Sequence, residues 1–92
     1  MKKFFYRVQK GDTVLAICQR FSCSMGKLIF INQLKSEVSA GDILLIERER
    51  KTYLVKPIDT IEKIANKFCI SPQSILEKNC VPYIFCGLII AI

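Results

Sequence analysis

The sequence predicts an α+β protein built from two tandem copies of one small βααβ module. Two observations carry this prediction. A shift of 47 residues superimposes the second half of the chain on the first, and each half passes from alternating apolar positions to a helical spacing and then to a short apolar run. A wholly charged segment separates the halves. We therefore expect a first module at residues 1–47, a linker at 48–51 and a second module at 52–92.

The repeat rests on identical residues at equivalent positions. A shift of 47 residues pairs Tyr6 with Tyr53, Val8 with Val55, Asp12 with Asp59, Thr13 with Thr60, Ile17 with Ile64, Phe21 with Phe68, Ser24 with Ser71 and Asn32 with Asn79. After a one-residue deletion, Gly41 falls on Gly87. Two copies of the module therefore fill the chain.

Each copy opens with a half-buried strand and continues into an amphipathic helix. Tyr6 and Val8 alternate with polar residues, as expected of a strand with one buried face. The helical stripes, at i, i+3, i+4 and i+7, are Val14, Ile17, Cys18 and Phe21 in the first copy and Ile61, Ile64, Ala65 and Phe68 in the second. Asp12 and Asp59 are the predicted N-caps, with Glu62 completing a capping box after Asp59.

A second helix and a final strand complete each copy. Ser24 and Ser71 are predicted N-caps, and Pro72 suits the first position of a helix because its missing N–H has no intrahelical partner there. Gly41 and Gly87 then turn the chain into the apolar runs at 43–46 and 88–92. Asn32 and Asn79, at the ends of the second helices, are expected to bond to nearby backbone and tie the loops together rather than to touch a ligand.

Composition argues against catalysis. The chain has 92 residues and no histidine, so it lacks a Ser-His-Asp or Cys-His pair and any imidazole metal ligand. We expect no enzyme activity, no metal and no cofactor. The five cysteines show no CxxC spacing, which favours free thiols in a reducing compartment, although Cys80 and Cys86 flank a short loop and are candidates for a disulfide under oxidation.

Neither end of the chain predicts a membrane segment. Arg7, Gln9 and Lys10 interrupt the apolar stretch that a signal peptide needs, so we expect synthesis in the cytoplasm without a conventional signal. Residues 79–92 are uncharged but shorter than the roughly 20 residues that span a bilayer. The net charge of +6 raises nucleic-acid or acidic-membrane binding as an alternative. The basic residues are dispersed, however, and the densest cluster, 47–51, contains two glutamates, so a solvated linker is favoured.

At these positions the chain resembles the LysM (lysin motif) family. In the first copy the resemblance lies in the stretch from Tyr6 to Val14, in Ser24 and Asn32, and in Ala40-Gly41-Asp42-Ile43-Leu44. In the second it lies in Tyr53-Leu54-Val55, Asp59-Thr60-Ile61, Ser71, Asn79 and Gly87. The resemblance implies a two-stranded antiparallel sheet with two helices on one face of each module. It also implies non-catalytic binding of N-acetylglucosamine-containing glycans, peptidoglycan and possibly chitin among them.

By the same resemblance, a shallow groove in each module would hold the sugar between the loop after the first strand and the loop before the last. The first groove would use Gly11, Asp12, Thr13 and Val14 on one side, with Leu34, Lys35, Ser36, Glu37 and Val38 opposite. The second would use Ile58, Asp59, Thr60 and Ile61 against Val81, Pro82, Tyr83, Ile84 and Phe85. Backbone N–H groups beside a small apolar surface suit the amide and methyl of an acetamide.

Two further expectations concern which of the two grooves binds the ligand and whether the partner is a glycan or a protein. Pro57-Ile58 replaces the family's small residue and glycine, which stiffens the second loop and favours the first site. A protein-interaction or assembly module, for example in spore coat or cortex morphogenesis, remains an alternative function, since some family members without signals belong to spore coat assembly. Exposure of Leu54 and of Ile84-Phe85 would favour a protein partner. A wall-associated or spore-associated final location would fit either function.

Overall fold

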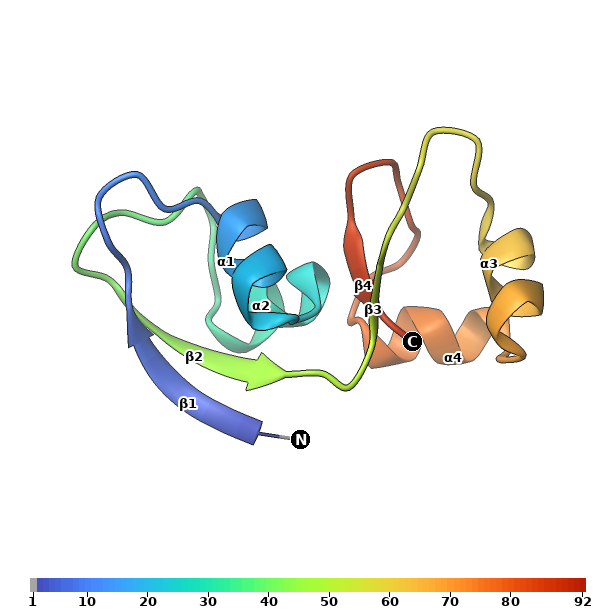
Figure 1. The fold of residues 1–92 in the computed structure, drawn as a ribbon, viewed down its shortest axis with the longest axis horizontal. Helices are drawn as coiled ribbons and strands as arrows, with labels where there is room; N and C mark the ends of the chain where they lie inside the picture. The colour runs from blue at the N-terminus through green and yellow to red at the C-terminus, as the bar shows by residue number, and fades with distance from the viewer. Residues whose placement is uncertain (1) are drawn as a thin grey trace.

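The computed structural model describes residues 2–92 and follows the repeated order of strand, helix, helix, strand (Figure 1). The first half contains β1 (Lys2–Arg7), α1 (Val14–Phe21), α2 (Met25–Ile31) and β2 (Ile43–Arg48). The second half contains β3 (Thr52–Leu54), α3 (Ile61–Phe68), α4 (Pro72–Lys78) and β4 (Ile89–Ala91). The predicted α+β class and the βααβ order are therefore confirmed.

Each half has its own two-stranded antiparallel sheet. In the first, β1 pairs with β2 from Lys2 opposite Arg48 to Arg7 opposite Ile43. In the second, β3 pairs with β4 over three residues, with Tyr53 opposite Ile90. The two sheets do not pair with each other. A short sheet is stable only against a packed apolar layer, which the helices of each half supply.

The helix caps differ in part from the prediction. Thr13 and Thr60, not the aspartates before them, cap α1 and α3, since their side chains accept the N–H groups of Ala16 and Lys63. The capping box expected between Asp59 and Glu62 is therefore wrong, because Lys63 stands three residues after the true cap. Two other predictions are confirmed. Ser24 and Ser71 cap α2 and α4, and Pro72 lies at the start of α4.

Asn32 and Asn79 hold the end of each second helix against the last strand. The Asn32 side-chain amide donates to the carbonyls of Leu28 and Leu45 at 2.9 and 3.0 Å, and its oxygen accepts the Leu45 N–H at 2.8 Å. Asn79 repeats this pattern with Ile75 and Ala91. The expected backbone bonding is confirmed, although it secures the strands rather than the loops.

Two apolar clusters form the core, one in each half. Ile17, Leu28 and Ile46 are fully buried in the first cluster, and Ile64, Ile75 and Ile90 in the second. Side chains also cross between the halves. Ile89 of β4 belongs to the first cluster, and Met25 of α2 packs against both. The halves therefore share apolar contacts, and Figure 1 shows α1 and α2 facing β4 across the junction.

The charged segment between the halves is solvated only in part, since Arg48, Arg50 and Lys51 are exposed whereas its two glutamates are not. Glu47 and Glu49 are buried, at 8% and 6% exposure, because the Lys27 ammonium lies 2.5 and 3.4 Å from their carboxylates. The segment also continues β2, and the Glu49 N–H donates to the Ser22 carbonyl. A buried ion pair that has lost water needs this close pairing to be tolerated.

Polar and backbone contacts also fix the junction. The Ser24 hydroxyl, which caps α2, donates to the Asn79 side-chain oxygen at 2.5 Å across 55 residues of sequence. Gly26 is buried against the second half, so that an added Cβ would lie 2.4 Å from the Asn79 carbonyl oxygen and from Cγ1 of Val81. Only glycine allows this approach.

The five cysteines are free; Cys18 and Cys23 are buried, whereas Cys69, Cys80 and Cys86 are exposed. Across residues 2–92, no group of three or more histidine, cysteine or acidic side chains is arranged to hold a metal ion. No single helix in that range is long and apolar enough to cross a bilayer. Taken together, α1 and α2 have the required length and apolar character, but the chain bends by 113° between them.

Candidate functional site

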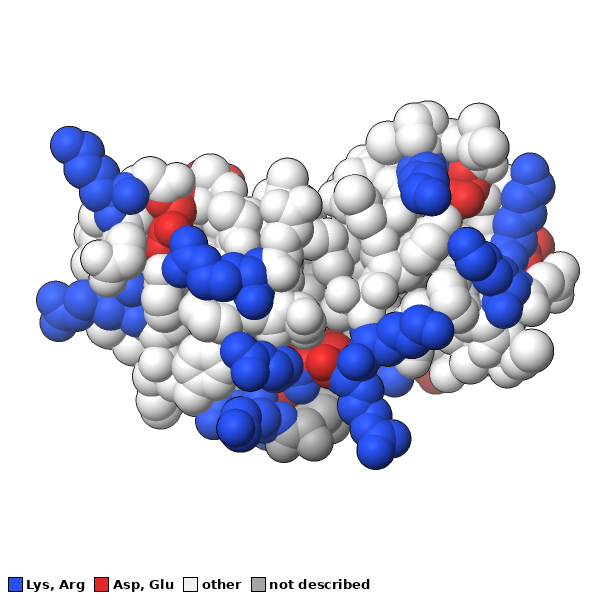
Figure 2. Space-filling model, in the orientation of Figure 1, with Lys and Arg blue, Asp and Glu red and all other residues white. Residues whose placement is uncertain are grey.

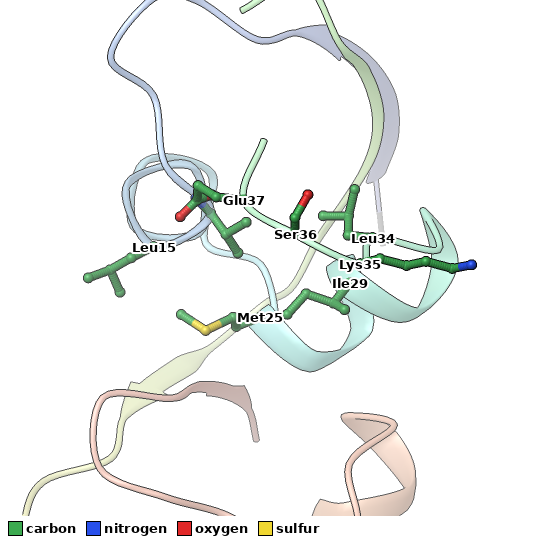
Figure 3. A pocket seen from close by; sticks show the side chains of 8 residues that line it. Leu15, Met25, Ile29, Leu34, Lys35, Ser36 and Glu37 are labelled. Carbon is green, nitrogen blue, oxygen red and sulfur yellow. The ribbon is translucent and has the colours of Figure 1, made fainter. Parts of the chain in front are cut away.

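A pocket of about 460 Å³ opens on the first half where α1 and α2 begin (Figure 3). Its lining consists of Val14, Leu15, Met25, Ile29, Leu34, Lys35, Ser36 and Glu37. Five of the nine residues predicted for the first groove, Val14 and 34–37, are therefore together around one cavity. Its mixture of alkyl side chains with a few polar groups is typical of small-ligand sites.

The other four predicted residues of the first groove have roles in the backbone and the core. Gly11 adopts a left-handed φ of 88° in the turn after β1, which glycine favours. Asp12 and Thr13 bond to the turn and to α1 respectively. Val38 is buried in the first apolar cluster. None of these four side chains lines the pocket.

A glutamate side chain bridges the two walls of the pocket. Oε1 of Glu37 accepts the Val14 N–H at 2.8 Å and the Val38 N–H at 3.0 Å. The Val14 N–H belongs to the first turn of α1, where backbone donors lack intrahelical partners and the helix dipole favours a negative charge. The carboxylate therefore occupies two backbone donors that the sequence-based argument left free for a sugar.

A tyrosine–aspartate hydrogen bond shapes the loop after the first strand in both halves. The Tyr6 hydroxyl donates to Asp12 at 2.5 Å, and the Gln9 N–H donates to the same carboxylate at 2.9 Å. Tyr53 and Asp59 repeat the contact at 2.6 Å. These hydrogen bonds favour the ionised carboxylates, so the pKa of Asp12 and that of Asp59 lie below their ordinary value. The aspartates are thus structural groups of the loop.

The first half adds a cation to this contact. The Arg20 guanidinium donates to the Tyr6 hydroxyl at 2.8 Å and to Asp12 at 3.1 Å. The equivalent cation in the second half, Lys67, lies 5.2 Å from the centre of the Tyr53 ring instead. The loop of the first half is therefore held by two more charged hydrogen bonds than its counterpart.

The second half does not gather its predicted groove residues in the same way. Ile58 is 80% exposed, and Thr60 caps α3. Ile61 and Ile84 pack against the second apolar cluster. The exposed Tyr83 and Phe85 rings lie edge to face, with centroids 6.3 Å apart, and Pro82 is exposed beside them.

Two residues predicted for the second groove line a cavity at the junction instead. Val81 and Phe85 surround a space of about 250 Å³ together with Met25, Gly26, Ile29, Phe30, Cys80 and Leu88. Met25 and Ile29 line both this cavity and the larger pocket, so the two hollows adjoin.

Leu15, Met25 and Ile29 were missed by the sequence analysis. One signal was available in α2, where Ile29 and Phe30 directly follow the buried Leu28 and extend the apolar run beyond the face that the core needs. Such surplus apolar residues on a short helix indicate a surface that meets something other than the helix's own core.

Comparison with known proteins accords with this architecture. The profile of the LysM domain matches residues 6–47 and 53–82. The cell wall-binding protein YocH of Bacillus subtilis (strain 168) is 41% identical over 66 residues, covering 66% of this chain and 23% of that protein. The chain thus spans less than a quarter of this relative's length.

Two solved structures are similar, both of the spore cortex-lytic enzyme SleL. The Bacillus megaterium QM B1551 enzyme has 31% identity and a TM-score of 0.47, covering 96% of this chain and 22% of that one. The Bacillus cereus enzyme has 16% identity and a TM-score of 0.50, covering 100% and 22%, and this likeness concerns the fold alone. With the domain profile matching 72 of the 92 residues (42 in the first segment and 30 in the second), the chain belongs to the LysM domain family.

Proposed function

We propose that this chain is a non-catalytic module that binds N-acetylglucosamine-containing glycans such as peptidoglycan, with chitin as a related ligand. The observation that carries the proposal is the pocket between Val14 and residues 34–37, two segments 20 residues apart that the family resemblance placed on opposite walls of one groove. The name of the relative YocH, a cell wall-binding protein, supports a wall glycan as the ligand. A location at a cell wall or spore belongs to the same proposal.

The chemistry of the pocket suits a neutral sugar. Leu15, Met25 and Ile29 offer an apolar surface to a pyranose face or an acetyl methyl, and Ser36 and Glu37 offer polar groups at the side. Figure 2 shows Lys and Arg side chains gathered along the lower edge. A neutral glycan carries no charge for salt to screen, so glycan binding at this pocket should depend little on salt.

The direct test is a nuclear magnetic resonance titration with N-acetylglucosamine oligomers of increasing length. We expect the backbone amides of residues 11–14 and 34–38 to shift together, with affinity rising until the oligomer fills the pocket. Glucose oligomers of equal length, which lack the acetamide, are the control. Shifts confined to residues 47–51, or no shifts at all, would contradict the proposal. Binding to DNA that weakens steeply with salt would favour a polyanion ligand.

A protein partner is a second candidate because apolar side chains are exposed at and near the junction. Leu54 is 45% and Phe85 50% exposed, and Phe30 is 66% exposed beside the junction cavity, whereas Ile84 is half-buried. This surface suits an assembly role. A pull-down that recovers a protein and no glycan, and that fails when Phe30 and Phe85 are both replaced by serine, would support it over wall binding.

A further inference from the structure

We propose that the two halves form one composite glycan site, in which a chain held in the first pocket continues into the junction cavity and the second half binds no chain of its own. The inference deepens the glycan-binding function proposed above and rests on it. Its basis is that Met25 and Ile29, four residues apart and so on one face of α2, line both hollows.

Contacts between the halves hold the junction cavity in place. The Ser24 hydroxyl donates to the Asn79 side-chain oxygen at 2.5 Å, and Gly26 lets the backbone at Asn79 approach α2 closely. Ile89 of β4 is buried in the apolar cluster of the first half. A surface that is formed before the ligand arrives loses little conformational entropy on binding. The junction can therefore act as part of a binding site rather than as a hinge.

The lining of the junction cavity suits a neutral sugar ring. Within residues 2–92, this lining holds no Lys, Arg, Asp or Glu, and Phe30 and Phe85 present aromatic rings to it from opposite halves. A pyranose ring has a face of C–H groups that packs against such rings. Its hydroxyl groups stay in water, because both phenylalanines are exposed to solvent. A further sugar of the same glycan chain would therefore bind here by apolar contact.

The size of the cavity favours an extension of the first pocket over an independent site. Small-molecule pockets usually measure about 300–1,000 Å³. At about 250 Å³ the junction cavity falls below this range, whereas the adjoining pocket of about 460 Å³ lies within it. The occupant that the geometry favours is therefore the glycan chain that already fills the larger pocket.

The second half lends its loop to this site in place of a groove of its own. Val81 and Phe85, which the family resemblance assigns to the second groove, line the junction cavity instead. Ile61 and Ile84, from the two sides of that groove, pack against the second apolar cluster. We therefore expect one bound glycan chain per molecule rather than two.

The experiment titrates the chain with the disaccharide and the hexasaccharide of N-acetylglucosamine, followed by nuclear magnetic resonance and by calorimetry. Both oligomers should shift the backbone amides of residues 11–14 and 34–38. Only the hexasaccharide should also shift those of Phe30, Val81 and Phe85. Calorimetry should give one hexasaccharide chain per protein molecule.

Matched variants separate a composite site from two independent grooves. Phe85→Ser should weaken hexasaccharide binding about threefold to tenfold and leave disaccharide binding unchanged, since the ring meets only the further sugar. Phe30→Ser, in the other half, should have the same effect. Ile58→Ser is the control, because Ile58 is an exposed apolar residue that the resemblance also assigns to the second groove, on the loop before α3. It should leave both affinities unchanged.

An exposed thiol gives an independent measurement. Cys80 lines the junction cavity, whereas Cys69 lies at the C-terminal cap of α3, and both are exposed. The hexasaccharide should slow alkylation of Cys80 by iodoacetamide, followed by mass spectrometry, and leave the rate at Cys69 unchanged. The disaccharide should protect neither thiol.

Several results would overturn the inference while leaving the proposed function in place. These are two hexasaccharide chains bound per molecule, a loss of affinity in Ile58→Ser but not in Phe85→Ser, or unchanged affinity in both phenylalanine variants. Capture of a protein that depends on Phe30 and Phe85, while hexasaccharide binding does not, would assign the cavity to a protein partner. If neither oligomer shifts the amides of the first pocket, the inference fails together with the proposed function.

Discussion

The two halves of this chain share the side-chain hydrogen bonds that hold the backbone, but they differ in the residues that line their surface hollows. Each has a tyrosine–aspartate bond in the loop after its first strand and an asparagine that joins its second helix to its last strand. The pocket walls differ, because residues 34–37 surround a cavity with a carboxylate whereas residues 81–85 are apolar or aromatic and partly face the junction. The repeated βααβ fold therefore carries two surfaces of different chemistry.

The largest expected difference between the halves lies at the two asparagines. Asn79 is fully buried and also accepts the Ser24 hydroxyl, whereas Asn32 is half-buried and its side chain bonds to Leu28 and Leu45 of its own half. Asn79→Ala leaves both backbone groups of Ala91 without their partner, and should lower the free energy of unfolding by about 3–4 kcal/mol. Asn32→Ala should lower it by about 2 kcal/mol. Urea denaturation of both variants measures the difference.

Equal losses for the two variants would show that the Ser24 contact and the deeper burial of Asn79 add nothing. Ser24→Ala supplies a partial control, since it removes the α2 cap together with the junction bond while leaving the Asn79 bonds within the second half in place. Ser71→Ala removes only a cap, so the excess effect at position 24 measures the junction bond.

A smaller effect is expected where α2 touches the second half. Alanine normally stabilises a helix by about 1 kcal/mol relative to glycine. At Gly26, however, the new Cβ would lie 2.4 Å from the Asn79 carbonyl oxygen, so Gly26→Ala should destabilise the chain by about 2 kcal/mol. The equivalent residue of α4 is Gln73, which is exposed, and Gln73→Ala should change stability by less than about 0.5 kcal/mol. Stabilisation by Gly26→Ala would mean that the halves separate in solution.

Most helices, caps and asparagine hydrogen bonds could be predicted from the sequence because they depend on residues that are close together along the chain. The apolar spacing identified α1 and α3, the serine caps and Pro72 identified the starts of α2 and α4, and the asparagines were assigned to backbone bonding. The caps of α1 and α3 were misplaced by one residue, because aspartate and threonine are both good caps and stand side by side. The tyrosine hydroxyl six residues before each aspartate and the N–H of the residue three before it both bond to the carboxylate, which leaves the threonine to cap the helix.

The junction and the pocket were harder to predict because they depend on contacts between distant residues. A run of five charges normally faces water, and the burial of its two glutamates here depends on Lys27, 20 residues before Glu47. Likewise, residues 34–37 were grouped through the family resemblance, whereas Met25 and Ile29 join them around the pocket only because α2 lies between the two halves. Charge pattern and periodicity carry no information on such pairings.

The smallest expected difference concerns the tyrosine–aspartate bonds and appears as a dependence on pH. The folded-state pKa of Asp12 lies below its ordinary value of 3.8, chiefly because the Tyr6 hydroxyl donates to it, so the contact stabilises the fold above that value and is lost as the pH falls through the folded-state pKa. Tyr6→Phe should therefore be less stable than wild type at neutral pH, with the gap closing as the pH falls below 3.8 and through the folded-state pKa of Asp12. Tyr53→Phe should show the same course with a smaller gap, because Arg20 adds its bonds only in the first half. A gap that stays constant down to low pH would assign the effect of the hydroxyl to packing against the neighbouring Phe21 or Phe68 ring rather than to the carboxylate.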